Sequence, residues 1–183
     1  MLTNGARQIR VRAKGQPSAP DDRDELAVDV EIREAGSGRP AYRGTVILGT
    51  RLAAAPGYIA DARRELHAFP RSAAEAYRDR LFHGPTFQCI TELEGIGPGG
   101  VVARIRPSVP ATSLAKPHAA HWLIDPILLD GGFQLALLWA REMRDMTALP
   151  SRIGALTRFA EPGMKSDILT CYFDIVPGAG DHT

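Results

Sequence analysis

The chain has 183 residues, a formal net charge of +1, 44% hydrophobic residues and 23% charged residues. This composition is that of a globular protein with one domain, or with two small domains that share a core. No apolar run approaches the roughly 18–20 residues of a membrane span, and no apolar stretch follows the basic N-terminus to form a secretory signal. A net charge near zero argues against a dedicated nucleic-acid binder. We therefore expect a cytoplasmic protein.

The first part of the chain reads as short strands. Residues 25–34 alternate apolar and polar side chains, which predicts a half-buried strand. A glycine- and proline-containing turn follows, and residues 42–49 form the second strand of a predicted hairpin. An earlier strand is expected at residues 7–13. Only one long helix is expected further along, so the fold class is α+β, with that helix packed on a sheet.

Residues 51–76 are interpreted as a linker between two similar halves. Near its end, Ser72 and Glu75 have the spacing of a capping box, which predicts a short helix over residues 73–79. Beyond the linker, strands are expected at the end of residues 82–94 and, after a glycine-rich turn, at residues 101–107. Two more are expected at residues 152–159 and 168–176.

The most informative segment is residues 125–146, which is apolar around most of a helix circumference and is therefore predicted to be a buried helix. Asp125 followed by Pro126 is a favourable helix start. The pair Gly131 and Gly132 is unusual, because each glycine costs about 1 kcal/mol in a helix interior. Either the helix begins after them, or another part of the chain approaches the backbone closely there.

Asp130 lies within this apolar segment, with Gln134 one helical turn later. Burial raises the pKa of a carboxyl group, and a carboxyl held neutral near pH 7 can act as a general acid. Gln134 would share a face with Asp130 and could hydrogen-bond the carboxyl. The alternative is that Asp130 caps a helix that begins after it. The two interpretations are compatible, because a capping carboxyl can also face a pocket.

The remaining candidates for chemistry are histidines and a cysteine. His83, in a turn, could be a base because imidazole titrates in the useful range, although a single histidine beside a turn is more often structural or exposed. His118 and His121 have no evident third ligand, so we interpret them as non-ligands of metal. Cys89 has no flanking base and is expected to be a packed, inert thiol.

Three short motifs occur in a fixed order: RLFHGPTF at residues 80–87, DGGFQ at residues 130–134 and LPSRI at residues 149–153. Together they resemble the dehydratase domain of modular polyketide synthases and of the related polyunsaturated fatty-acid synthases. The corresponding family motifs are Gly-Tyr-x-Tyr-Gly-Pro-x-Phe, Asp-x-x-x-Gln/His and Leu-Pro-Phe-x-Trp, of which the last is only partly kept. The motif that carries the family's base, His-x-x-x-Gly-x-x-x-x-Pro, has no counterpart in this chain.

The resemblance implies a double hotdog fold, in which two halves each wrap an antiparallel sheet around a long helix. On this basis, residues 1–50 would be the closing strands of a first hotdog, residues 51–76 the linker and residues 77–183 a second hotdog with its central helix at about 125–146. The chain would then be a partial double hotdog. Its exposed sheet edge and helix face would favour association, and we expect a homodimer.

The resemblance also implies elimination of water from a (3R)-3-hydroxyacyl chain, which gives an enoyl thioester. The acyl chain would be carried on the phosphopantetheine arm of an acyl carrier protein, beside neighbouring synthase domains, with no metal or redox cofactor. Asp130 would be the general acid and Gln134 would orient it, while the base would come from outside this chain. The predicted substrate contacts are His83, Gly84, Pro85, Phe87, Phe133, Leu149 and Pro150.

Two alternatives stay open at this point, and with them the question whether the chain is an enzyme. The first is a non-catalytic dehydratase-like module that binds acyl carrier protein or holds a synthase together. The second is a homodimeric hotdog thioesterase or hydratase, in which His83 would supply the base.

Overall fold

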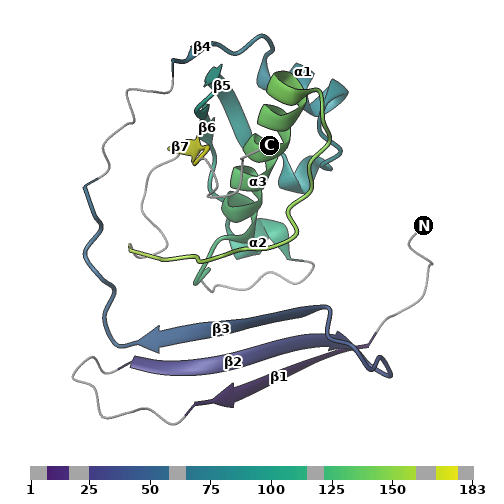
Figure 1. Ribbon diagram of the computed structural model, residues 1–183, viewed down its shortest axis with the longest axis vertical. Helices are drawn as coiled ribbons and strands as arrows, with labels where there is room; N and C mark the ends of the chain where they lie inside the picture. Colours follow the sequence, from purple (N-terminus) through teal and green to yellow (C-terminus); the bar gives the residue numbers. More distant parts are fainter. Residues whose placement is uncertain (1–7, 17–24, 58–64, 115–121, 160–167, 177–183) are drawn as a thin grey trace, which may run out of the picture. The chain divides into compact units, whose positions relative to one another are not determined.

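A computed structural model describes residues 8–16, 25–57, 65–114, 122–159 and 168–176 of the chain. The chain divides into two compact units, Met1–Ala54 and Ala55–Thr183, and each is described by itself (Figure 1). Within the described residues no helix has both the length and the apolar character to cross a membrane.

The first unit is a three-stranded antiparallel sheet in the order β1-β2-β3. Its strands are β1 (Ile9–Gly15), β2 (Glu25–Glu34) and β3 (Tyr42–Gly49), so the three predicted strands are confirmed. The register places Val28 opposite Val46 and Asp29 opposite Thr45, and the Thr45 hydroxyl donates to Asp29 Oδ1 at 2.9 Å. The predicted alternation therefore separates an apolar face of the sheet from a polar one.

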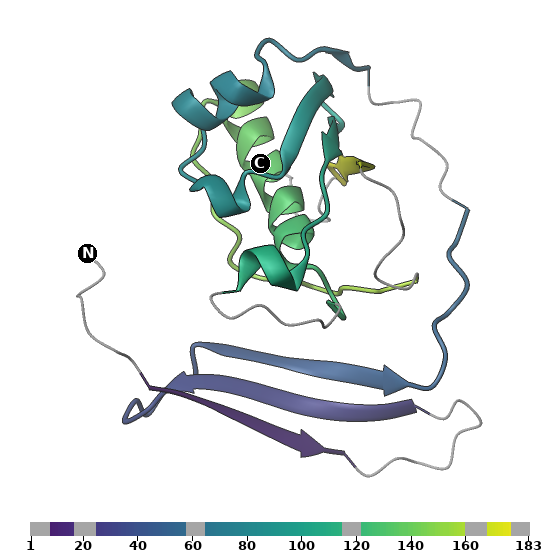
Figure 2. The ribbon, with the colours of Figure 1, turned by 180° about the vertical axis from the view of Figure 1, so that it is seen from behind.

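The second unit contains a four-stranded antiparallel sheet in the order β4-β5-β6-β7. Its strands are β4 (His67–Ala68), β5 (Ile90–Gly97), β6 (Gly100–Ile105) and β7 (Leu169–Asp174). Short helical segments are α1 (Ala73–Asp79), the 3-10 turn η2 (Pro85–Phe87) and α2 (Pro110–Ser113). The long helix α3 (Pro126–Arg144) contacts β5, β6 and β7 (Figure 2).

The core of this unit lies between α3 and the sheet. Its largest fully buried side chains are Ile96, Val101, Ile105, Gln134, Leu135 and Leu138. Gly100 allows the sheet to close behind the β5–β6 turn, because a Cβ there would lie 2.0 Å from the Phe173 carbonyl oxygen of β7 and the residue has a φ of +150°. The helix is thus held on the sheet along its apolar side, as its sequence predicts.

The start of α3 decides between the two interpretations of Asp130. Asp125 is the N-cap, and its Oδ1 accepts hydrogen bonds from the backbone N–H groups of Ile127 at 2.9 Å and Leu128 at 3.3 Å. The Ser108 hydroxyl and backbone N–H also donate to this carboxylate. Asp130 is therefore inside the helix, and the alternative that it caps a later helix is wrong, because Asp125 already fills that role.

Gly131 explains half of the glycine pair. A Cβ on Gly131 would lie 2.8 Å from Cys89 Sγ and 3.1 Å from Ile105 Cδ1, whereas a Cβ on Gly132 would meet nothing within 4 Å. The close approach predicted for this segment is therefore confirmed at Gly131. Nothing in the structure explains Gly132.

Two sequence expectations differ from the structure. The strand expected at residues 152–159 is wrong: these residues form no strand, and nearly all of them are exposed. The segment follows Pro150 and has no hydrogen-bonded neighbour among the described strands, because β6 is paired with β5 and β7. In addition, β4 and the first residues of α1 belong to the second unit although they fall within the predicted linker.

Candidate active site

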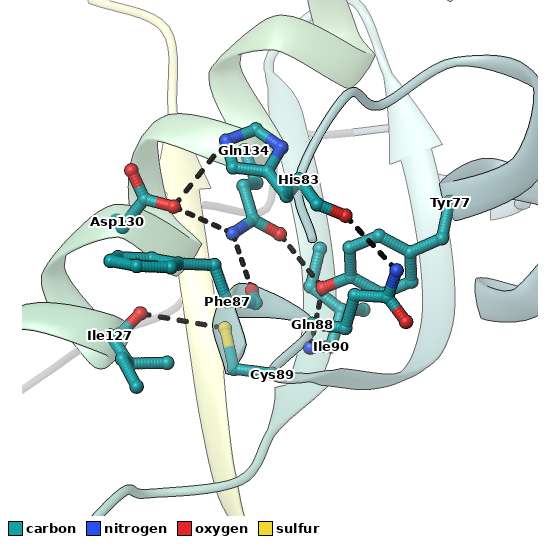
Figure 3. Close-up of polar contacts among 9 residues, drawn as sticks. All are labelled: Tyr77, His83, Phe87, Gln88, Cys89, Ile90, Ile127, Asp130 and Gln134. Carbon is teal, nitrogen blue, oxygen red and sulfur yellow. Dashed lines mark hydrogen bonds and ion pairs between the residues drawn. The ribbon is translucent and has the colours of Figure 1, made fainter. Parts of the chain in front are cut away.

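The predicted pair on α3 is present in the structure. Gln134 Nε2 donates a hydrogen bond to Asp130 Oδ2 at 2.7 Å (Figure 3). Gln134 is fully buried, whereas the Asp130 side chain is 28% exposed. The helical spacing of four residues brings the two side chains together on one face. The amide is thus fixed in the core while the carboxyl reaches the surface.

A directional chain of hydrogen bonds fixes the Gln134 amide. Its Nε2 also donates to the Phe87 carbonyl oxygen at 2.8 Å, and its Oε1 accepts from the Tyr77 hydroxyl at 2.7 Å. The Tyr77 oxygen in turn accepts from the Ile90 backbone N–H at 2.9 Å. Because the Phe87 carbonyl can only accept and the Ile90 N–H can only donate, each proton in the chain has one place.

This chain determines which oxygen of Asp130 is available. Oδ2 receives an N–H from Gln134. Oδ1 makes no hydrogen bond with any residue that the structure describes. An oxygen that accepts an N–H is a poor place for the acid proton, so that proton belongs on Oδ1. The carboxyl therefore has one anchored oxygen and one free oxygen.

Tyr77 is a site residue that the sequence analysis missed. It lies on α1, the helix predicted from the capping box, and it packs against the core. Burial raises the pKa of the Tyr77 phenol, so the hydroxyl keeps its proton and donates to Gln134. A tyrosine on the apolar side of a short helix, beside Ala73 and Ala76, is the signal that could have identified it.

We expect the substitution Tyr77→Phe to lower the free energy of unfolding by about 1–3 kcal/mol, because it leaves the Gln134 Oε1 and the Ile90 N–H without their partner. Urea denaturation would measure the difference. The matched control is Tyr42→Phe, since Tyr42 is 71% exposed. Equal stability of both variants and the parent chain would contradict the role of Tyr77.

His83 is also brought to Asp130. Its Nε2 lies 3.4 Å from Asp130 Oδ2, and its side chain is 12% exposed. The ring stacks on Phe82 with 4.4 Å between centroids, and the His83 carbonyl oxygen accepts from Gln88 Nε2 at 3.0 Å. The turn before η2 therefore holds an imidazole against the carboxyl (Figure 3).

Residues 59–169 match the family model described as the polyketide synthase dehydratase N-terminal domain. The match covers more than half of the chain. The chain belongs to the polyketide synthase dehydratase family. This family has the hotdog fold, and the antiparallel sheets with their helices confirm the predicted α+β hotdog class. The predicted division into a first and a second hotdog stays a prediction.

A curated relative of this dehydratase chain is one of the subunits of the polyunsaturated fatty acid synthase of Thraustochytrium sp.. The two sequences are 32% identical over 134 residues, which is 69% of this chain but only 5% of the relative. The chain thus spans a small fraction of the relative that it matches. A comparison with solved structures gave no significant match.

The other predicted contact residues of the dehydratase site fall into two groups. Gly84, Pro85 and Phe87 belong to the η2 turn beside His83, and Phe133 is half-buried on α3, one turn after Asp130. Leu149 and Pro150 instead lie in the exposed segment after α3, and neither makes a hydrogen bond with Asp130, Gln134 or His83. His118 and His121 lie outside the described residues.

Two further features border the site without entering its chemistry. A cavity of about 260 Å³ shares Pro85, Gln88 and Cys89 with the η2 region, but Asp130 and His83 do not line it. Within the described residues, no group of three or more His, Cys, Asp or Glu side chains could hold a metal ion.

Cys89 is buried beneath Gly131, and its thiol donates to the Ile127 carbonyl oxygen at 3.4 Å. Burial raises the pKa of this thiol to about 11. At pH 8 the thiol therefore stays protonated in the folded protein, and only the thiolate is nucleophilic. The structure agrees with the predicted packed thiol.

We expect Cys89 to resist iodoacetamide at pH 8 in the folded chain and to react fully once the chain is unfolded in urea. The variant Cys171→Ser removes the only other cysteine, so mass spectrometry would then report Cys89 alone. Rapid alkylation of the folded variant at pH 8 would contradict the burial and the raised pKa.

Proposed function

We propose that this dehydratase-family chain catalyses elimination of water from a (3R)-3-hydroxyacyl thioester, with Asp130 as the general acid. The observation that carries the proposal is the division of labour between the two carboxyl oxygens. Gln134 anchors Oδ2, so a proton on Oδ1 can be presented to a substrate hydroxyl. Family membership supplies the reaction class, and the free oxygen supplies a group suited to it.

The proposed reaction breaks two bonds in the acyl chain. A base takes the proton from the α carbon, whose acidity the thioester carbonyl increases. The electron pair forms the α,β double bond, the bond from the β carbon to the hydroxyl oxygen breaks, and the Asp130 proton converts the leaving hydroxyl to water. The products are an enoyl thioester, one water molecule and the Asp130 carboxylate.

The carrier of the acyl chain is part of the same proposal. We propose that the substrate arrives on the phosphopantetheine arm of an acyl carrier protein, and that the chain works beside neighbouring synthase domains. Support comes from the similarity to a small part of a much longer synthase chain. The arm is then part of the substrate, not a resident cofactor. The predicted homodimer likewise stays a prediction.

The test is to incubate the chain with the pantetheine thioester of (3R)-3-hydroxybutyrate and to look for loss of one water by mass spectrometry. The free acid, which lacks the thioester, is the matched control, and we expect no loss of water from it. A parallel titration with acyl-carrier protein separates catalysis from binding. Binding without turnover would instead support the non-catalytic module, and neither binding nor turnover would contradict both functions.

A further inference from the structure

We propose that His83 is the general base that works with Asp130, so that the acid and the base of the elimination both lie within this unit. The inference rests on the proposed function. It differs from the expectation that the base comes from outside the chain. Three observations carry it: the position of the imidazole, the state of its two ring nitrogens and the proton balance of the reaction.

The first observation is position. His83 Nε2 lies 3.4 Å from Asp130 Oδ2, so both groups can reach adjacent carbons on one side of an acyl chain. Elimination requires a base at the α carbon and an acid at the oxygen on the β carbon, which are neighbours along the chain. Stacking on Phe82 and the hydrogen bond from Gln88 hold the imidazole in place before a substrate arrives.

The second observation is the hydrogen bonding of the ring. Nδ1 of His83 is buried and has no hydrogen-bond partner among the described residues. A histidine that serves stability normally has both ring nitrogens satisfied, because an unsatisfied buried polar atom costs about 1–3 kcal/mol. The other described histidine, His67, is exposed on β4. The poor satisfaction of His83, together with a carboxyl group at Nε2, indicates a residue kept for its chemistry.

The third observation is that the pair balances protons by itself. The reaction begins with a neutral imidazole and a protonated Asp130. The α proton moves to His83 Nε2, the Asp130 proton leaves in the water, and an imidazolium faces a carboxylate at the end. Transfer of that proton from His83 to Asp130 across the 3.4 Å contact restores both groups. No other proton donor or acceptor is required for the next turnover.

The test uses the full chain and measures the dehydration rate of the pantetheine thioester for three variants. We expect His83→Ala and His83→Gln to lose a factor of about 10² to 10⁴ in rate, and His67→Ala to keep the parent rate. Circular dichroism would check that each variant is folded. Added imidazole should restore part of the rate of His83→Ala, because it can enter the space that the side chain leaves, and it should not restore Asp130→Asn.

Each other outcome decides the question. If both His83 variants keep the parent rate while Asp130→Asn loses it, the base lies elsewhere and only this inference fails. If both His83 variants are inactive and imidazole does not restore His83→Ala, His83 is a positioning residue and the inference is overturned. If the parent chain itself shows no turnover, the proposed function fails first and the inference fails with it.

Discussion

Replacement of Asp130 by asparagine is expected to reduce the dehydration rate by a factor of about 10² to 10⁴, the usual contribution of a general acid. The asparagine side-chain oxygen can still accept the hydrogen bond from Gln134, so the local geometry is retained. The amide cannot transfer a proton to the leaving hydroxyl, and that step is lost. Steady-state rates with the pantetheine thioester of (3R)-3-hydroxybutyrate would measure the effect.

The matched control is Asp145→Asn. Asp145 is exposed at the C-cap of α3 with a φ of 51°, a left-handed conformation that asparagine tolerates. The same chemical change on the same helix should leave both the rate and the stability unchanged. If the Asp130→Asn and Asp145→Asn variants turn over substrate equally fast, Asp130 is not the acid.

Replacement of Gly131 by alanine is expected to destabilise the second unit, with overpacking that costs about 1–3 kcal/mol. The new Cβ would lie 2.8 Å from Cys89 Sγ and 3.1 Å from Ile105 Cδ1. Both neighbours are buried in the core, so neither can move without disturbing the contact between α3 and the sheet. Thermal or urea denaturation would measure the loss.

Gly132→Ala provides the comparison, because a Cβ at Gly132 meets nothing within 4 Å. Alanine is favoured over glycine in a helix interior by about 1 kcal/mol, so this variant should be more stable than the parent chain. Adjacent glycines of one helix are thus expected to respond with opposite signs. A stabilising Gly131→Ala would show that Cys89 and Ile105 do not pack against α3 as described.

Local signals predicted several parts of the fold. The capping box at Ser72 and Glu75 gave the short helix α1 with its correct bounds, and the dipeptide at Asp125 gave the start of α3. Both features depend on residues close in sequence, where side chains bond to the nearby backbone. The strand expected at residues 152–159 failed because strand formation needs a partner far away in sequence.

The candidate site was predictable only where its members share one helix. Helical periodicity places Gln134 beside Asp130, and the structure shows that bond. Tyr77 and the Phe87 carbonyl reach Gln134 from α1 and η2, and no spacing rule connects those segments to α3. The contact between His83 and Asp130 likewise depends on how η2 packs against α3, so the sequence could offer His83 only as one candidate.

The central claim, that Asp130 exchanges a proton with the oxygen on the β carbon, is tested most directly in the reverse direction. The parent chain and Asp130→Asn would each be incubated with crotonyl pantetheine thioester in heavy water, and the products followed by mass spectrometry. The account predicts that the parent chain adds one water and one non-exchangeable deuterium at the α carbon, while Asp130→Asn leaves the enoyl thioester almost unchanged. Hydration at equal rates by the two proteins would contradict it.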